Sequence, residues 1–183
     1  AGKSVALVSD AGTPLVSDPG YRLAQQAIEA GYRVIPIPGA SAPLAALVGS
    51  GLPNDAFLFA GFLPTKDKAR RARLAEFANA PATLIFFESP HRIGATLLAA
   101  ADVLGGARQA SVCRELTKTY EEFRRGTLSD LAVHYEEHDN VKGEIVLVIG
   151  PPKEQPATEA DVDAILTDLA KSLPTAKAAT EAS

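Results

Sequence analysis

Two glycine-containing loops hold the residue types best suited to binding a small ligand. The first, SDAGTP, offers the carboxylate of Asp10 and the hydroxyl of Thr13. Its Gly12 permits a positive φ and a close approach of a ligand to the backbone. The second loop, PGASA (residues 38–42), adds the hydroxyl of Ser41. A short glycine loop is a weak signal by itself, because a tight turn with self-bonded polar side chains has the same composition.

Both loops follow short apolar runs that are typical of buried strands. These runs cover residues 4–9 (SVALVS) and 32–37 (YRVIPI), and a predicted helix over 19–30 separates them, with Asp18 as its cap. A strand–helix–strand unit implies a parallel pair of strands. Open α/β sheets bind ligands at the carboxyl ends of neighbouring parallel strands. We therefore expect the two loops to form one crevice.

A second group of candidate side chains follows two later strands. FFESPHR places Glu88 at the end of a predicted strand, where it could accept a hydrogen bond from a ligand. His91 and Arg92 follow in the first helical turn, where the helix dipole favours anions. RELTK follows another strand and contains Glu115 and Lys118. A solvated helix start and an edge ribbon with surface ion pairs explain the same residues without a ligand.

A cluster of basic residues stands out in a chain whose net charge is −4. It lies on a predicted helix and consists of Lys66, Lys68, Arg70, Arg71 and Arg73. Together with Arg92, Arg124 and Arg125 it could form a surface for a phosphate backbone. The alternative is a solvated helix face.

The remaining elements are predicted from hydrophobic periodicity and turn residues. The predicted strands cover residues 56–62, 82–88, 110–116 and 143–150, and a short strand or extended loop covers 120–126. The predicted helices cover 65–80, 90–104 with Ser89 as cap, and 127–138 with a Thr127–Asp130 capping box, and a shorter one runs from Ser41 to about residue 50. A proline-rich linker and a helix over 159–171, capped by Thr158, are expected to follow.

Composition excludes several classes of protein. The 183 residues are 46% apolar and 22% charged, as in an ordinary globular protein. The single cysteine, Cys113, excludes an internal disulfide and suits a reducing compartment. No apolar run reaches about 18 residues, which predicts a cytoplasmic protein without a membrane segment. No metal-ligand spacing, Walker loop, G-x-S-x-G elbow or G-x-G-x-x-G motif is present, so no metal site is predicted.

The motifs, taken together, resemble a known family. LVSDAGTPLVSDPG, IPIPGASA, FAGFLP, LIFFESPHRI, RELTKTYEE and KGEIVLVIG occur in the order and at the spacing of the tetrapyrrole methylases, the class III S-adenosylmethionine-dependent methyltransferases. The resemblance covers about residues 5–150. FESPHR and RELTK are specific to the branch that acts on ribosomal RNA. The resemblance thus implies 2′-O-methylation of a cytidine ribose in 16S ribosomal RNA, in the small ribosomal subunit.

The resemblance also implies a fold and a cofactor site. It predicts a homodimer with a two-lobed α/β fold, in which residues 1–52 are a parallel βαβ remnant of the first lobe. Residues 53–150 are then a mixed-sheet second lobe, and 151–183 a linker and the start of a helical appendage. The implied S-adenosylmethionine contacts are Asp10, Ala11, Gly12, Thr13, Ser41, Ala42, Glu88, Glu115 and Leu116.

The implied reaction needs a group that removes the proton of a ribose hydroxyl. The candidates are Glu88, Glu115, His91 and Lys118, and the residue types do not choose among them. Arg92, Arg114 and Lys118 suit phosphate or ribose contacts better. Two alternatives remain: a methylase of a small tetrapyrrole-like substrate on the same fold, and a non-catalytic, dimerising RNA-binding piece.

The chain departs from the family pattern at its two ends. It contains no methionine, enters a predicted strand almost at once and stops in an alanine-rich run, TAKAATEAS. These features indicate truncation at both ends. We therefore expect the chain as given to bind the cofactor feebly or not at all.

Overall fold

The computed structural model describes residues 2–9, 12–138, 140–153 and 167. Contacts divide the chain into two units, residues 1–152 and 153–183, and the fold described below is that of the first. The linker and the helix predicted over 159–171 lie outside the described residues, apart from the start of the linker and Thr167, which is helical. The proposed boundary at residue 52 stays a prediction.

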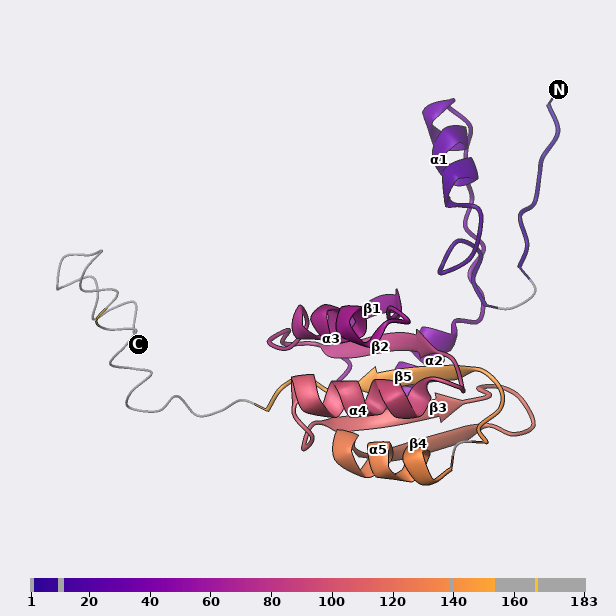
Figure 1. The fold of residues 1–183 in the computed structure, drawn as a ribbon. Helices are drawn as coiled ribbons and strands as arrows, with labels where there is room; N and C mark the ends of the chain where they lie inside the picture. The colour runs from indigo at the N-terminus through magenta and orange to yellow at the C-terminus, as the bar shows by residue number, and fades with distance from the viewer. Residues whose placement is uncertain (1, 10–11, 139, 154–166, 168–183) are drawn as a thin grey trace. The chain divides into compact units, whose positions relative to one another are not determined.

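Five strands form one mixed sheet in the order β1-β2-β5-β3-β4 (Figure 1). They are β1 (Phe57–Phe62), β2 (Thr83–Glu88), β3 (Gln109–Arg114), β4 (Glu122–Thr127) and β5 (Ile145–Ile149). β1 and β2 are parallel, and every other neighbouring pair is antiparallel. Glu88 and Arg114 both pair with Ile145, and Arg114 also pairs with Glu122. One end of the sheet therefore collects the last residues of β2 and β3 and the first residues of β4 and β5.

In the described part of residues 1–152, five helices accompany the sheet. They are α1 (Tyr21–Glu29), α2 (Ala42–Ser50), α3 (Asp67–Ala75), α4 (Ile93–Leu104) and α5 (Leu128–Glu137). The predicted capping box at the start of α5 is confirmed, since Thr127 Oγ1 accepts from the Asp130 N–H and the Asp130 carboxylate accepts from the Thr127 N–H. Among the described residues, no helix combines the length and the apolar character needed to cross a bilayer.

Alternation along the strands sorts the core into two layers. On β2, Leu84 and Phe86 belong to the cluster that packs under α3, α4 and α5, whereas Ile85 and Phe87 face the α2 side. This is the period of two that a strand with both faces covered requires. The fold class predicted for this part, a mixed α/β sheet, is confirmed.

Helix α2 is held at its carboxyl end by the edge strand β4. Arg125 donates from Nε to the Ser50 carbonyl (3.0 Å) and from Nη2 to the Gly49 carbonyl (2.5 Å). A Cβ on Gly49 would overlap the ring of Phe123. The close approach of β4 therefore requires a glycine at this position. The two hydrogen bonds from Arg125 hold the carboxyl end of α2 against β4.

Three local predictions are wrong. Residues 4–9 and 32–37 form no strand, and Val5, Val8 and Ile37 are 89%, 82% and 82% exposed. A strand needs a hydrogen-bonded neighbour, and no described strand lies beside either segment, so the predicted parallel pair does not form. Helix α1 has Gly20 rather than Asp18 as its N-cap.

The third concerns the start of α4, which begins at Ile93 rather than at Pro90. Residues 90–92 form a turn in which the Arg92 N–H donates to the Ser89 carbonyl (3.0 Å). Ser89 is not the cap, because the N-cap of α4 is Arg92 and the helix has no side-chain capping hydrogen bond.

Candidate functional site

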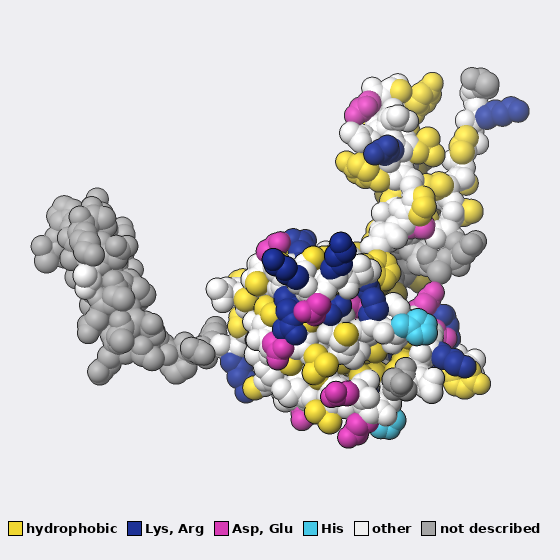
Figure 2. All heavy atoms as spheres, viewed as in Figure 1, with side chains coloured by type: hydrophobic (Ala, Val, Ile, Leu, Met, Phe, Trp, Pro, Cys, Tyr) yellow, Lys and Arg dark blue, Asp and Glu magenta, His cyan; other side chains and the backbone are white. Residues whose placement is uncertain are grey.

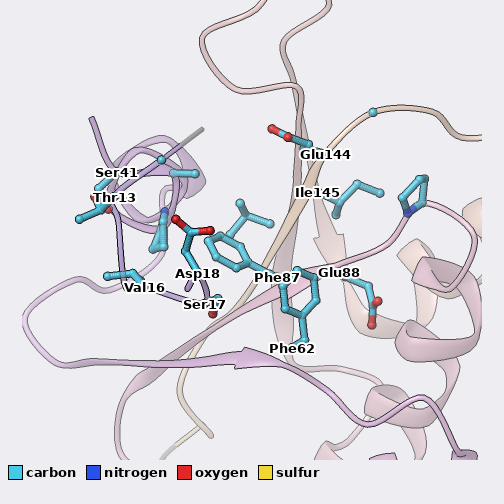
Figure 3. A pocket seen from close by; sticks show the side chains of 16 residues that line it. Thr13, Val16, Ser17, Asp18, Ser41, Phe62, Phe87, Glu88, Glu144 and Ile145 are labelled. Atoms are coloured by element: carbon cyan, nitrogen blue, oxygen red, sulfur yellow. The ribbon is translucent and has the colours of Figure 1, made fainter. Parts of the chain in front are cut away.

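A cavity of about 340 Å³ opens where the two glycine loops meet the end of the sheet (Figure 3). Its walls come from residues 12–18, the start of α2, the end of β2 and the start of β5. The predicted cofactor residues that line it are Gly12, Thr13, Ser41, Ala42 and Glu88. Asp10 and Ala11 lie outside the described residues. The volume falls within the range of small-molecule sites, about 300–1,000 Å³.

The two loops come together without the strands that were predicted to position them. Thr13 Oγ1 donates to the Ala40 carbonyl (3.2 Å), which joins the first loop to the second. Gly12 has φ of 71°, and a Cβ at that position would have no atom within 4 Å. Ser41 is the N-cap of α2, but its side chain makes no capping hydrogen bond. The loops therefore present a left-handed glycine and a hydroxyl at the wall of the cavity.

The opposite wall of the cavity is apolar. Phe62 and Phe87 lie with ring centroids 5.4 Å apart, and Ile145 and Val146 from β5 lie beside them. Phe62 is 58% exposed although it ends a strand. An apolar wall facing a few polar groups is the arrangement that holds a small organic ligand.

The carboxylate of Glu88 is held by other side chains. Its Oε1 accepts from Arg92 Nε (2.8 Å) and Nη2 (2.5 Å), and its Oε2 accepts from Thr96 Oγ1 (2.7 Å). The side chain is fully buried. Glu88 lies on the same face of β2 as Leu84 and Phe86, the face covered by α3, α4 and α5. Its carboxylate is therefore directed toward α4 rather than into the cavity. Figure 3 shows this carboxylate turned away from Asp18 and Phe87.

Glu115 lies beside the cavity without lining it. Its Oε1 accepts from the Glu144 N–H (2.9 Å) and from Lys118 Nζ (2.8 Å), and Lys118 also pairs with Glu144 Oε2 (3.1 Å). The bond from Lys118 holds the pKa of Glu115 below its usual value, and Glu115 in turn raises the pKa of Lys118. Leu116 packs against the core under α2. These residues support the Gly143–Glu144 wall of the cavity from behind.

The loop that carries Glu115 has a strained backbone. Glu115 and Thr117 adopt positive φ values of 49° and 65°, which non-glycine residues rarely do. Gly143 has φ of 94°, and a Cβ there would lie 2.5 Å from the Glu115 side chain. Only a glycine fits against Glu115 at this point.

Two carboxylates that the sequence reasoning did not select line the cavity. Asp18, which the sequence predicts as a helix cap, makes no hydrogen bond or ion pair within the described chain, and Figure 3 shows its carboxylate turned toward the Phe87 ring. Glu144 had no assigned role. The repeated Ser-Asp of SDAGTPLVSDP was the signal that could have pointed to Asp18. His91 is exposed and is not among the lining residues.

The arginines of the basic cluster pair with carboxylates of the same chain. Figure 2 shows Lys and Arg side chains interspersed with Asp and Glu side chains on one face of the protein. Arg70 is 5% exposed and pairs with Asp67 (2.7 Å), whereas Arg71 bridges Asp67 (2.8 Å) and Asp102 (2.9 Å). Arg73 pairs with Glu76 and lies over the Phe77 ring. Lys66 and Lys68 are exposed and form no ion pair with any described residue.

The other predicted RNA contacts have structural partners as well. Arg92 pairs with Glu88, and Arg114 pairs with Glu122 (3.1 Å) and donates to the Lys142 carbonyl (3.3 Å). Arg124 also pairs with Glu122 (2.7 Å). Arg125 anchors α2. The predicted phosphate surface is therefore reduced to its lysines and to the arginines that keep an exposed edge.

Comparison with known proteins identifies the family of the chain. The family model for Tetrapyrrole (Corrin/Porphyrin) Methylases matches residues 1–132. A relative from Mesorhizobium japonicum named Ribosomal RNA small subunit methyltransferase I is 60% identical over 99% of the chain and 62% of the relative. The protein of the same name from Vibrio cholerae is 49% identical over 97% of the chain and 63% of the relative. The chain thus spans less than two thirds of the length of these relatives.

Solved structures share the fold at low sequence identity. The methyltransferase CobJ has a TM-score of 0.56 and 18% identity, covering 80% of this chain and 64% of its own. Uroporphyrin-III C-methyl transferase from Thermus thermophilus, complexed with S-adenyl homocysteine, has a TM-score of 0.52 and 18% identity, with 76% and 62% covered. At such identities the likeness describes the fold alone.

Proposed function

Because the chain belongs to the tetrapyrrole (corrin/porphyrin) methylase family, we propose that this protein transfers a methyl group from S-adenosylmethionine to 16S ribosomal RNA. We further propose that the acceptor is the 2′-hydroxyl of a cytidine. The observation that carries the proposal is the 60% identity, over 99% of the chain, to a protein named as a small-subunit ribosomal RNA methyltransferase. The likeness to the two solved methyltransferase structures, at 18% identity, is one of fold only.

The residues around the cavity suit S-adenosylmethionine. Gly12 has open space where a Cβ would lie, so the loop backbone can approach a ligand closely. The Ser41 hydroxyl makes no capping hydrogen bond to α2 and can therefore bind a ligand. The amino end of α2 favours a carboxylate, which the methionine part of the cofactor carries. Phe62 and Phe87 offer an apolar surface for its less polar parts. When bound, the cofactor supplies an electrophilic methyl group on a sulfonium with a neutral leaving group.

The protein's own residues must then align the ribose hydroxyl and take its proton. Alignment supplies most of the rate, and a general base adds about 10²- to 10⁴-fold. We propose Asp18 as this base, since it is the lining carboxylate without a described partner. Glu88 and Glu115 are proposed as positioning residues, because their oxygens are already occupied. His91 and Lys118 remain candidates of lower rank, since neither lines the cavity.

The proposed partner is the small ribosomal subunit or its 16S RNA. Lys66 and Lys68, at the start of α3, are proposed to contact phosphates together with the exposed edges of Arg71, Arg73, Arg92 and Arg114. Arg70 is too buried to take part. We retain the homodimer and the cytoplasmic location as parts of the proposal, on the strength of the family resemblance and the ribosomal RNA named for the relatives.

The experiment that tests the function is methyl transfer by the protein at its full encoded length. Unmethylated small subunits are incubated with labelled S-adenosylmethionine, and the digested RNA is analysed for 2′-O-methylcytidine. Appearance of this nucleoside supports the proposal, whereas methylation of a base, or of no nucleotide, contradicts it. Gly12→Val should abolish cofactor binding, and Gly31→Val, at a matched positive φ of 77° away from the cavity, should not.

Asp18→Asn tests the proposed base. We expect kcat to fall by about 10²- to 10⁴-fold with little change in cofactor affinity. Asp55→Asn changes an exposed carboxylate outside the cavity and serves as the control. An Asp18→Asn enzyme with unchanged kcat and an unchanged pH profile would remove Asp18 from this role.

A further inference from the structure

A second hollow, of about 650 Å³, lies at the same end of the sheet as the cavity. Its walls come from the end of β3, the first half of β4, the last turns of α5 and residues 140–142. We call it the β4–α5 hollow. Cys113 faces α2, and Arg114, the next residue of β3, faces the opposite way. The hollow therefore lies on the face of the sheet that is covered by α3, α4 and α5. The cavity lies toward α2, on the other face.

The charges around the β4–α5 hollow favour an anion. Three cations (Arg114, Arg124 and Lys142) and two carboxylates (Glu122 and Glu137) line it, so 3 − 2 leaves one excess positive charge with neutral histidines. Among the described carboxylates, Glu122 is the one that pairs with both arginines. Lys142 is exposed, and its ammonium group forms no ion pair with the described part of the chain.

Aromatic rings accompany these cations. Tyr120, on the rim, is 73% exposed, whereas Tyr135 closes the inner wall and is 6% exposed. Two histidines, His134 and His138, stack with ring centroids 4.4 Å apart on the α5 side. An exposed ring beside cations is the arrangement that holds single-stranded nucleic acid, because the ring stacks on a base while the cations contact phosphates.

One short segment joins the hollow to the cavity. Val141 and Lys142 line the hollow, and Gly143, Glu144 and Ile145 line the cavity. An RNA strand that crosses the end of the sheet over this segment reaches both. The unpaired bases of single-stranded RNA can be splayed out along such a path, whereas a rigid duplex cannot follow it.

We propose that the β4–α5 hollow binds a nucleotide of single-stranded RNA that neighbours the methylated one, with its base on Tyr120 and its phosphate at Lys142. This rests on the proposed function, because it assigns the flanking part of the same RNA. The contacts are independent of base identity, so the hollow holds the strand, and the choice of target lies elsewhere.

The test measures binding of a fluorescent ten-residue oligocytidylate to the protein at its full encoded length, by anisotropy and without cofactor. Tyr120→Ala should raise Kd at least about fivefold, the lower end of what loss of one base stack produces. Tyr120→Phe should keep the affinity. Tyr32→Ala is the matched control, because Tyr32 is 72% exposed and lies outside the hollow.

Lys142 is tested through the salt dependence. Lys142→Ala should reduce the slope of log K against log salt by about 0.7, the value for one phosphate contact on a single strand. Lys153→Ala, another exposed lysine, should leave it unchanged. Equal melting temperatures for all variants show that the fold is intact.

The outcomes separate this proposal from the proposed function. If Tyr120→Ala binds oligocytidylate as tightly as Tyr32→Ala, the hollow is not an RNA site, even where the unaltered protein methylates ribosomal RNA. If the unaltered protein does not methylate RNA but Tyr120→Ala alone weakens binding, the hollow stands as an RNA site and the proposed activity does not.

Discussion

Removal of the Arg92 guanidinium should destabilise the fold far more than removal of a surface arginine. In Arg92→Met the fully buried Glu88 carboxylate loses two of its four hydrogen bonds and keeps those from the Ser89 N–H and Thr96. Leaving a buried charge without its partner costs about 3–5 kcal/mol. Because two donors remain and Arg92 is 23% exposed, we expect the lower end, about 3 kcal/mol.

Arg71→Met is the matched control. Arg71 also bridges two carboxylates, but its partners Asp67 and Asp102 are 57% and 64% exposed, so the expected cost is about 0.5–1 kcal/mol. Urea unfolding at equilibrium measures both. With a slope near 2 kcal/mol/M, Arg92→Met should lower the midpoint by about 1.5 M.

A double variant separates the charge from the packing. Glu88→Gln with Arg92→Met leaves a neutral amide in place of the unpaired carboxylate, so it should be more stable than Arg92→Met alone. Equal costs for Arg92→Met and Arg71→Met, or a double variant less stable than the single one, would refute the reasoning.

Three further predictions concern packing, protonation and reactivity. Gly94→Val should cost about 1–3 kcal/mol in urea unfolding, because a Cβ on Gly94 lies 3.1 Å from the Tyr135 carbonyl where α4 meets α5, whereas exposed Ala95→Val should cost about 0.7 kcal/mol or less. Burial, together with the charges of Arg124 and His138, lowers the pKa of His134. The unfolded chain therefore binds a proton at His134 more readily than the folded one, and the free energy of unfolding should fall as pH drops below 6.5. His134→Gln should reduce this dependence of stability on pH, and an unaltered pH profile would contradict the prediction. Burial raises the pKa of the Cys113 thiol to about 11, so a thiol reagent such as dithionitrobenzoate at pH of about 8 should label it only after denaturation, and rapid labelling of the native protein would show that the site opens.

The second half of the fold could be predicted because its signals are local. The apolar runs of β2 and β5, the glycine after α2 and the Thr127–Asp130 box each need only a few neighbouring residues. The segments 4–9 and 32–37 have the same apolar composition, but a strand exists only beside another strand. Composition indicates that a segment favours the extended conformation, but it does not show whether a neighbouring strand is present to pair with it.

The candidate site could be predicted only in outline. The glycine loops were found because glycine and hydroxyl groups are visible in sequence, and five of the predicted residues line the cavity. The orientation of the Glu88 side chain could have been predicted, because alternation along β2 places it on the same face as Leu84 and Phe86, toward α4. The pairing of Arg71 with Asp102 could not be predicted, because Asp102 lies 31 residues further along the chain.

Helix α2 connects the wall of the cavity to the edge strand β4. Its nine residues span about 13 Å, from Ser41 at the cavity to Gly49 and Ser50 at β4. So short a helix moves as one body, and displacement of its carboxyl end by a side chain at position 49 would also displace Ser41. A genetic screen for weakened ligand binding should therefore return substitutions at Gly49 and Arg125, and these would be mistaken for contact residues although neither lines the cavity.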